Sequence, residues 1–253
     1  MRLDLALVER GLVRSRNQAA RLVVDGEVTV NGQVVSKASF DVSNADRLVV
    51  MQESYVARSA HKLLFALSHF EIKVPSFCLD VGASTGGFTQ VLLERGAEKV
   101  IALDVGTDQL SLELKHDPRV IELSGVNIRD FDPMSLPISP VQIQLAVVDL
   151  SFISLKLVAR QILSCAPNAD FVFLIKPQFE LQRSDLNSQG VVTDPERRRY
   201  GLEQAIEGLS EAGFRLLSLA QSPMTGGKGN VEFLAHCRAG EPTELKSLLA
   251  GLD

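Results

Sequence analysis

Cysteines are scarce in this 253-residue chain. The three that are present, Cys78, Cys165 and Cys237, lie far apart and form no C-x-x-C pair. An odd and sparse set of this kind predicts reduced, buried thiols in a cytosolic protein rather than a disulfide framework. The chain also shows no cluster with metal-ligand spacing, so we predict no metal site.

Long hydrophobic runs are missing as well. No stretch approaches the roughly 18 uncharged apolar residues that a membrane span requires. The first residues include Arg2, Asp4 and Glu9, which do not fit the apolar core of a secretory signal. Internal repeats and low-complexity segments are likewise not found. We therefore expect a cytoplasmic protein with no membrane partner.

Basic residues are fewer than acidic ones, and the resulting net charge of −5 does not favour a nucleic-acid partner. The imbalance lies in the larger part of the chain, because residues 1–51 hold seven Lys and Arg against six Asp and Glu. Clustered arginines in a nearly neutral segment can form a local positive face. Composition alone therefore neither requires nor excludes RNA binding.

The first fifty residues predict a small α+β domain over 1–51. After one amphipathic helix, Ser15 and Gln18 form a capping box at the start of a second helix. Two strands follow, joined by Asn31-Gly32, a pair typical of a type I′ turn. A third strand at 48–50 completes the unit.

Residues 15–32 strongly resemble the S-four RNA-binding domain. This resemblance implies contacts with the backbone and shape of RNA, since the edges of an RNA duplex are difficult to recognise. The candidate RNA-binding residues are Arg2, Arg14, Arg16 and Arg21. Without the surrounding motif, a solvated helix face would be the preferred interpretation of the arginines in the second helix.

From about residue 77, strand-like apolar runs alternate with helical patterns. Such alternation predicts a mostly parallel sheet wrapped by helices. The predicted strands are 77–81, 100–103, 120–123, 143–148, 171–175, 216–219 and 231–236. We expect a seven-stranded α/β domain over 77–240. A linker and entry helix over 52–76 precede it, and a tail helix over 241–253 follows it.

A glycine-rich turn between the first of these strands and the next helix predicts a ligand site. It is neither the dinucleotide motif G-x-G-x-x-G nor a phosphate-binding loop. Asp80, ahead of the glycines, suits a ligand with an amine, and Asp104 at the next strand end can accept both hydroxyls of an adenosine ribose. Together these features predict S-adenosylmethionine. The candidate donor-site residues are Asp80, Gly82, Ala83, Ser84, Gly86, Gly87, Phe88, Asp104, Val105, Asn127, Ile128 and Asp149.

The turn Gly82-x-Ser84-x-Gly86-Gly87-Phe88 resembles that of FtsJ-like ribose methyltransferases. Together with the S-four domain and four further motifs, it makes the chain similar to the TlyA family over nearly its whole length. Those motifs are Ala60–Leu63, Val148–Ser154, Ile175–Glu180 and Gly229–Leu234. One departure is Ser59, where the family usually has glycine. The resemblance implies a Rossmann-like methyltransferase that uses S-adenosylmethionine on the ribose 2′-hydroxyl of a cytidine in ribosomal RNA.

The resemblance also implies a Lys-Asp-Lys-Glu catalytic set, at Lys62, Asp149, Lys176 and Glu232. Asp149 and Lys176 end apolar strands, at the sheet edge where open α/β sheets bind ligands. Glu232 lies inside a predicted apolar strand, where a carboxylate needs a partner. For Lys62 a position on the helix surface fits the pattern equally well.

Methyl transfer to a hydroxyl requires that its proton be removed. Lys176 is the candidate base, because desolvation and a second cation at Lys62 favour a neutral amine. Asp149 and Glu232 would orient the two amines. A base methyltransferase more often has a [DN]-P-P-[FY] motif or a nucleophilic cysteine, and residues 149–152 contain neither. Ribose is therefore the predicted acceptor.

Two rival functions come from other classes. A haemolysin, a label that the family has also carried, would need an exposed amphipathic or apolar segment, and none is evident. A non-catalytic RNA-binding protein would not need the intact Lys-Asp-Lys-Glu set. The absence of an extension before Arg2 resembles the shorter form of the family, which implies large-subunit RNA. We expect ribosomal RNA or a ribosomal subunit as partner, and no obligate protein partner.

Overall fold

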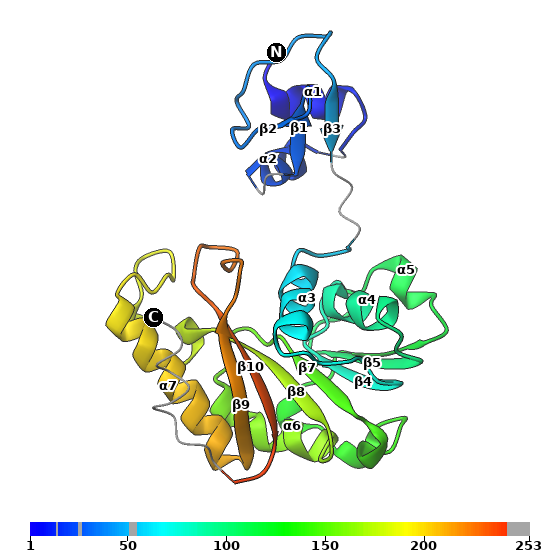
Figure 1. Ribbon diagram of the computed structural model, residues 1–253, viewed down its shortest axis with the longest axis vertical. Coiled ribbons are helices and arrows are strands. Elements are labelled where there is room, and N and C mark those ends of the chain that lie inside the picture. The colour runs from blue at the N-terminus through cyan, green and yellow to red at the C-terminus, as the bar shows by residue number, and fades with distance from the viewer. Residues whose placement is uncertain (14, 25–26, 51–54, 242–253) are drawn as a thin grey trace. The chain divides into compact units, whose positions relative to one another are not determined.

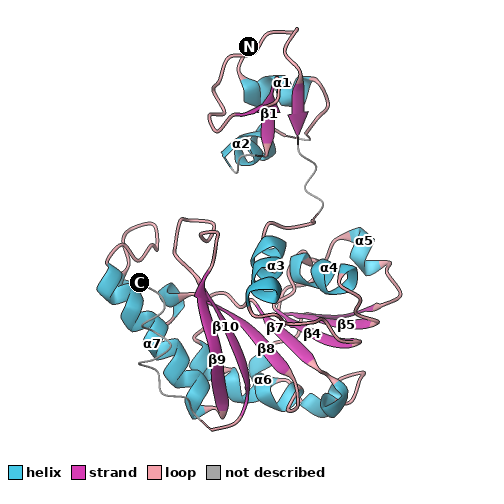
Figure 2. Cartoon of the chain, viewed as in Figure 1, coloured by secondary structure: helices cyan, strands magenta, loops and turns pink. Residues whose placement is uncertain are grey.

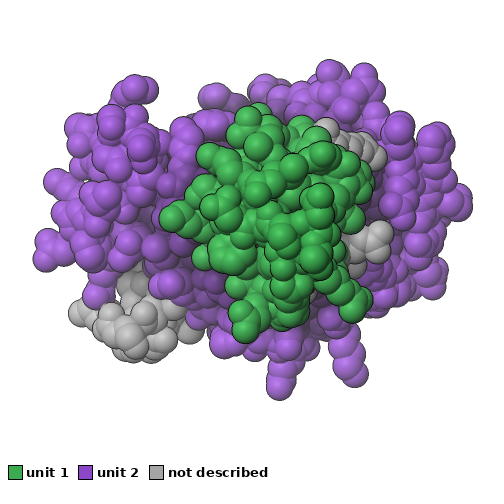
Figure 3. Space-filling view, turned by 90° about the horizontal axis from the view of Figure 1, so that it is seen from above, with its two compact units in different colours: residues 1–54 green, residues 55–253 purple. Residues whose placement is uncertain are grey.

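The computed structural model describes the chain apart from residues 14, 25–26, 51–54 and 242–253. The chain divides into unit 1, Met1–Ser54, and unit 2, Tyr55–Asp253 (Figure 3). Each unit has a hydrophobic core of its own. The tail helix predicted at 241–253 lies, apart from its first residue, outside the described residues.

Unit 1 packs two helices against a small antiparallel sheet of order β2-β1-β3 (Figure 2). Its elements are α1 (Leu3–Glu9), α2 (Arg16–Val24), β1 (Val28–Val30), β2 (Gln33–Val34) and β3 (Leu48–Val50). Asn31 and Gly32 have φ angles of 53° and 85°, as a type I′ turn requires, which confirms the predicted hairpin. The Ser15 hydroxyl accepts the backbone N–H of Gln18 at 3.3 Å, so the predicted cap of α2 is present.

Unit 2 contains a seven-stranded sheet of order β6-β5-β4-β7-β8-β10-β9 (Figure 1). The strands are β4 (Phe77–Val81), β5 (Lys99–Asp104), β6 (Val120–Ser124), β7 (Leu145–Val148), β8 (Asp170–Ile175), β9 (Phe214–Gln221) and β10 (Phe233–Ala239). The first five in spatial order are parallel, and β10 is antiparallel to both of its neighbours. This confirms the predicted Rossmann-like α/β fold.

Helices cover both faces of this sheet. The apolar sides of α3 (Ser59–His69) and α4 (Gly87–Glu94) are buried on one face, and those of α6 (Ala159–Cys165) and α7 (Pro195–Glu211) on the other. A short helix, α5 (Leu112–Lys115), precedes β6. The remaining helical turns are of the 3-10 type: η1 (Ile128–Asp130), η2 (Pro133–Ser135), η3 (Pro140–Gln142), η4 (Leu155–Leu157), η5 (Pro177–Phe179) and η6 (Arg183–Asp185).

The strand predicted at 216–219 begins earlier, at Phe214, and two other predicted strands begin later than expected. The strand predicted at 143–148 begins at Leu145, because Pro140 initiates η3 and Ile143 closes that turn. The strand predicted at 231–236 begins at Phe233, whose pairing partner Ile175 is the last residue of β8. Glu232 is therefore in the loop before β10 rather than inside a strand.

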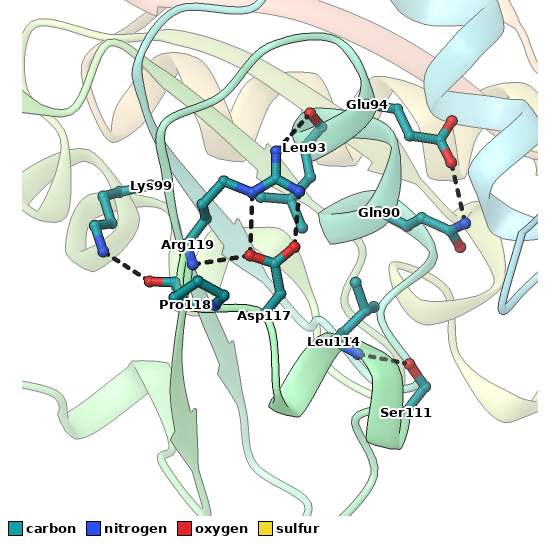
Figure 4. Close-up of polar contacts among 9 residues, drawn as sticks. All are labelled: Gln90, Leu93, Glu94, Lys99, Ser111, Leu114, Asp117, Pro118 and Arg119. Carbon is teal, nitrogen blue, oxygen red and sulfur yellow. Dashed lines mark hydrogen bonds and ion pairs between the residues drawn. The ribbon is translucent and has the colours of Figure 1, made fainter.

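Hydrogen bonds tie the amino-terminal ends of β5 and β6 to the helices beside them (Figure 4). Arg119 binds Asp117 through its guanidinium at 2.7 and 3.0 Å, and it also reaches the carbonyl oxygen of Leu93 at the end of α4. Lys99 donates to the carbonyl oxygen of Pro118 at 2.7 Å. Because Asp117 and Pro118 already bind these two cations, they form a structural network rather than a ligand surface.

Three phenylalanines form the aromatic centre of the core beneath β8 and β9. Phe214 meets the rings of Phe171 and Phe173 edge-on, at centroid distances of 4.8 and 5.1 Å. All three side chains are fully buried. Phe214 begins β9, so this packing holds the antiparallel edge of the sheet onto its parallel part.

We expect Phe214→Ala to lower the free energy of unfolding of unit 2 by about 3–5 kcal/mol, because it leaves a cavity among packed aromatic rings. Denaturant titration followed by tyrosine fluorescence measures this directly, since both tyrosines, Tyr55 and Tyr200, belong to unit 2. The control Met134→Ala changes an exposed side chain and should stay within about 0.5 kcal/mol of wild type. Equal unfolding midpoints for the two variants would contradict this account of the core.

Candidate active site

Four adjacent strands bring the polar residues of the site to one edge of the sheet. Asp80 lies on β4, Asp104 ends β5, Asp149 follows β7 and Lys176 follows β8. β5, which follows β4 in the chain, pairs with one side of β4, and the later strand β7 pairs with its other side. In open α/β sheets this reversal of strand order opens the ligand crevice at the carboxyl ends of the strands.

The turn after β4 depends on glycine because the main chain of the loop that follows β7 lies against it. Gly82 has φ of 88°, and a Cβ there would collide with the carbonyl oxygen of Asp149. Gly86 caps α4 with φ of 98°, and a Cβ there would collide with the side chain of Leu114. Both conformations are ones that glycine adopts without strain. The glycine spacing therefore holds the turn close to the residues after β7.

Asp104 connects this turn to the loop that follows β5. Its carboxylate accepts the backbone N–H of Ser84 at 2.8 Å and that of Gly106 at 2.7 Å, one on each oxygen. Each carboxylate oxygen retains a second acceptor position. The side chain is thus fixed in place with acceptor positions left, and its binding of two ribose hydroxyls stays a prediction.

Asp80 is fully buried beneath the turn. The Thr89 hydroxyl donates to Oδ2 at 2.7 Å, while Oδ1 has no partner among the described residues. Burial raises the pKa of Asp80 to about 7, the hydrogen bond from Thr89 opposes this rise, and the carboxylates of Asp149 and Asp104 add to it. Three carboxylates therefore converge on the turn, one of them with an unsatisfied oxygen.

The four residues of the predicted catalytic set form two ion pairs. Lys176 Nζ lies 2.6 Å from Asp149 Oδ1 and donates to the Ser151 hydroxyl at 2.8 Å. Lys62 and Glu232 are paired with each other, and both are buried. Lys62 is therefore not the surface lysine that the pattern of α3 also permitted.

Two cavities in unit 2 meet at Lys176. The smaller, of about 230 Å³, lies against the glycine turn and reaches Asp149. The larger, of about 1010 Å³, contains the Lys62–Glu232 pair. Arg58, Ser59, Ser151 and Lys176 line both cavities. A group held in one cavity can thus meet a group held in the other beside the Lys176 amine.

Not all the candidate donor-site residues reach the smaller cavity. Gly82, Ala83, Ser84, Phe88 and Asp149 line it. Of the residues predicted to border an adenine, Asn127 caps η1 by accepting the backbone N–H of Arg129 at 3.1 Å, and Ile128 is buried in the core. Val105 is 70% exposed. Asp80, Gly86, Gly87 and Asp104 do not line the smaller cavity either, so the cofactor role of the candidate residues stays a prediction.

Several residues of the larger cavity were not predicted from the sequence. Phe152 has φ of 65°, is 89% exposed and lies with its ring 5.2 Å from that of Phe179. Ser151 lies two residues after Asp149 in the motif Val148–Ser154, from which only Asp149 was predicted to belong to the site. Four cations also line the cavity: Arg58, Arg129, Arg183 and Lys228. These four residues are spread over nearly the whole of unit 2, so no local sequence pattern indicates that they share a cavity.

The departure at Ser59 has a simple structural account. Ser59 is the first residue of α3, and its φ is not positive, so the backbone does not require glycine there. Its hydroxyl instead occupies the space that a Cβ on Gly87 would enter. The two positions complement each other in size where α3 meets α4.

In unit 1, two of the predicted RNA-binding arginines come together. Arg2 and Arg16 both bind the carboxylate of Asp4. Arg14 lies outside the described residues, and for Arg21 only the backbone, within α2, is described.

No group of three His, Cys, Asp or Glu side chains that could hold a metal occurs in the described part of the chain. Within that same part, every helix is too short or too polar to span a bilayer.

A doubly wound sheet with a glycine turn, converging carboxylates and a Lys–Asp pair at its carboxyl edge defines a Rossmann-like methyltransferase. Comparison with protein families agrees: residues 55–239 match the FtsJ-like methyltransferase family, and residues 1–48 match the S4 domain, the S-four domain of the sequence analysis. The chain belongs to the FtsJ-like methyltransferase family.

Known relatives extend over nearly the whole chain. The chain is 43% identical to the 16S/23S rRNA (cytidine-2′-O)-methyltransferase TlyA of Mycobacterium tuberculosis, over 94% of this chain and 89% of that protein. It is 34% identical to the 23S rRNA (cytidine-2′-O)-methyltransferase TlyA of Campylobacter jejuni, over 92% and 97%. A solved structure from Streptococcus thermophilus, described as a hemolysin, has 34% identity and a TM-score of 0.75, over 99% and 94%.

The raised pKa of Asp80 predicts a pH-dependent stability. Folding favours the protonated carboxyl, so the stability of unit 2 should fall as pH rises from the unfolded value of 3.8 toward 7. Asp80→Asn imitates the protonated form and should remove this loss. Between pH 5 and pH 8 its advantage over wild type should grow by roughly 2 kcal/mol, measured by denaturant titration without ligand. Parallel pH profiles for the two proteins would show that Asp80 titrates normally.

Proposed function

We propose that the protein transfers a methyl group from S-adenosylmethionine to the ribose 2′-hydroxyl of a cytidine in large-subunit ribosomal RNA. The observation that carries the proposal is the position of Lys176, paired with Asp149 where the two cavities meet. Both rRNA methyltransferase relatives carry 23S rRNA and cytidine in their names. The proposed place of action is the cytoplasm, where ribosomal subunits are available.

Three observations on carboxylates around the glycine turn, which borders the smaller cavity, support this methyl donor. Asp104 is fixed with two acceptor positions available, which suits a ribose diol. Asp80 has an unsatisfied buried oxygen. The carboxylates of Asp80, Asp104 and Asp149 favour a ligand with positive charge. When bound, S-adenosylmethionine supplies a methyl group on a positively charged sulfur.

The larger cavity suits an RNA nucleotide. Arg58, Arg129, Arg183 and Lys228 bring positive charge to its walls, where phosphates of a single strand would lie. Phe152 offers an exposed aromatic face for an unstacked base. Glu180 accepts the backbone N–H of Leu155 at 2.9 Å and so fixes the loop that carries this ring.

Within this proposal Lys176 Nζ accepts the proton of the ribose hydroxyl. The role requires a neutral amine at the moment of transfer. Asp149 and Ser151 orient that amine toward the junction of the cavities. Glu232 balances the charge of Lys62, which keeps a buried cation near the reacting groups without leaving it unpaired.

The donor site predicts a binding defect for Asp104→Ala. Loss of charge-assisted hydrogen bonds to the ribose should weaken the affinity for S-adenosylmethionine at least about tenfold, measured by calorimetry. Asp108→Ala is the matched control, because Asp108 is an exposed carboxylate nearby in the chain that forms an ion pair with Lys115. If both variants bind the donor like wild type, Asp104 does not contact it.

The acceptor is tested with a target nucleotide that lacks the 2′-hydroxyl. This substrate should bind like the natural one, because phosphate contacts dominate the interface, and it should accept no methyl group. Lys176→Met should abolish transfer while donor and RNA remain bound. The control Lys228→Met should change the apparent KM and leave kcat close to wild type. Methylation of the deoxy substrate at the normal rate would exclude ribose as the acceptor.

The target is identified by mapping 2′-O-methylated nucleotides in ribosomal RNA from cells with and without the gene. A large-subunit cytidine methylated only when the protein is present supports the assignment. Methylation at another nucleotide, or in the small subunit alone, contradicts it.

A further inference from the structure

A buried carboxylate in unit 1 binds two arginines, one just before α1 and one at the start of α2. Asp4, in α1, accepts Arg2 Nε at 3.0 Å on Oδ1 and Arg2 Nη2 at 3.1 Å on Oδ2. Arg16, the first residue of α2, donates its Nη2 to the same Oδ2 at 3.1 Å. The Asp4 side chain is only 5% exposed, whereas those of Arg2 and Arg16 are 49% and 57% exposed.

This arrangement fixes two side chains that would otherwise be mobile. A carboxylate withdrawn from water is costly unless it is paired and hydrogen-bonded. The hydrogen bonds from Arg2 lower the pKa of Asp4 despite its burial, and those from Arg16 add to this effect, so the carboxylate stays charged. Long surface arginines ordinarily lose entropy when they bind a ligand, and here much of that ordering is already present in the free protein.

Asp4, Arg2 and Arg16 together carry one net positive charge, with the carboxylate of Asp41 also acting on Arg2, and several of their donors are unused. Among the described residues, Nη1 of Arg2 and both Nε and Nη1 of Arg16 have no hydrogen-bond partner. The two Nη2 atoms bind one oxygen, so they are separated by no more than about twice a hydrogen-bond length. Two guanidinium groups this close, with free donors and net positive charge, match a single phosphodiester.

We propose that Asp4 is a positioning residue that holds Arg2 and Arg16 as a paired clamp for one phosphate of the RNA backbone. The inference rests on the proposed function, in that the ligand is ribosomal RNA. It assigns to an acidic residue a role in binding a polyanion. Removing that acid should therefore weaken RNA binding, although the charge of the protein becomes more favourable.

The sign of the effect distinguishes this clamp from a general positive surface. Asp4→Asn removes one negative charge from the protein and keeps the side-chain shape. If the arginines act only through their charge, the variant binds RNA more tightly. If Asp4 positions them, the Kd rises, by roughly tenfold for the loss of one charge-assisted contact. The slope of log Kd against log salt should also fall in magnitude by about one, because one fewer phosphate is neutralised.

The experiment uses the full chain and a ribosomal RNA fragment that contains the mapped nucleotide, with Kd measured at several salt concentrations. Glu9→Gln is the matched control, since Glu9 is an exposed residue of α1 and its loss changes the net charge equally. This control should bind as tightly as wild type or slightly more tightly. Donor affinity, which belongs to unit 2, should be unchanged in both variants.

A second variant keeps the proposal testable if Asp4→Asn disturbs the folding of unit 1, which amide NMR spectra of the full chain would reveal. Arg16→Lys retains the charge but removes the guanidinium fork, and its Kd should rise to a similar extent. Combining it with Asp4→Asn should add little, because both changes dismantle the same clamp.

The possible failures are distinguishable. If the wild-type chain does not bind the RNA fragment, the proposed function is wrong. If wild type binds and Asp4→Asn, correctly folded, binds equally or more tightly, only the clamp is wrong. An Arg16→Lys variant with wild-type affinity and salt dependence would overturn the clamp in the same way.

Discussion

The ion pair between Lys176 and Asp149 is the interaction on which the site depends. Each residue follows a buried parallel strand, and the two strands are neighbours, so the sheet itself determines their separation. A helix or a mobile loop would not hold an amine and a carboxylate 2.6 Å apart with comparable rigidity. The glycine turn, the two cavities and Ser151 are all arranged around this pair, and the remainder of unit 2 serves to place two strand ends side by side.

Negative charge is concentrated at this edge in a way that disfavours the free protein. Asp80, Asp104 and Asp149 converge, and burial of Asp80 has little compensation beyond Thr89. A site built for stability alone would use an amide or an apolar residue there. A bound cationic ligand would offset this repulsion, so these carboxylates are better explained by binding than by folding.

Much of the architecture could be predicted from the sequence, because alternating apolar runs and a distinctive glycine turn are local signals. The strand Phe77–Val81 was predicted at its observed bounds, and the Asn31-Gly32 hairpin followed from two residues alone. The start of β10 was not predictable, since Glu232 has apolar neighbours in the sequence whether the strand begins before it or after it. The exposed ring of Phe152 and the encirclement of Asp4 by two arginines depend on tertiary contacts between distant segments.

The contact between Gly82 and the main chain of Asp149 has a genetic consequence. A side chain at position 82 would displace the loop that carries Asp149, and the position of Lys176 would change with it. Unit 1 has a separate core and would be unaffected. If unit 1 binds ribosomal RNA as proposed, such a mutant would still occupy that RNA without modifying it. In a cell that also expresses the intact enzyme, it would act as a competitor, so that a single methyl-sized change could produce a dominant phenotype.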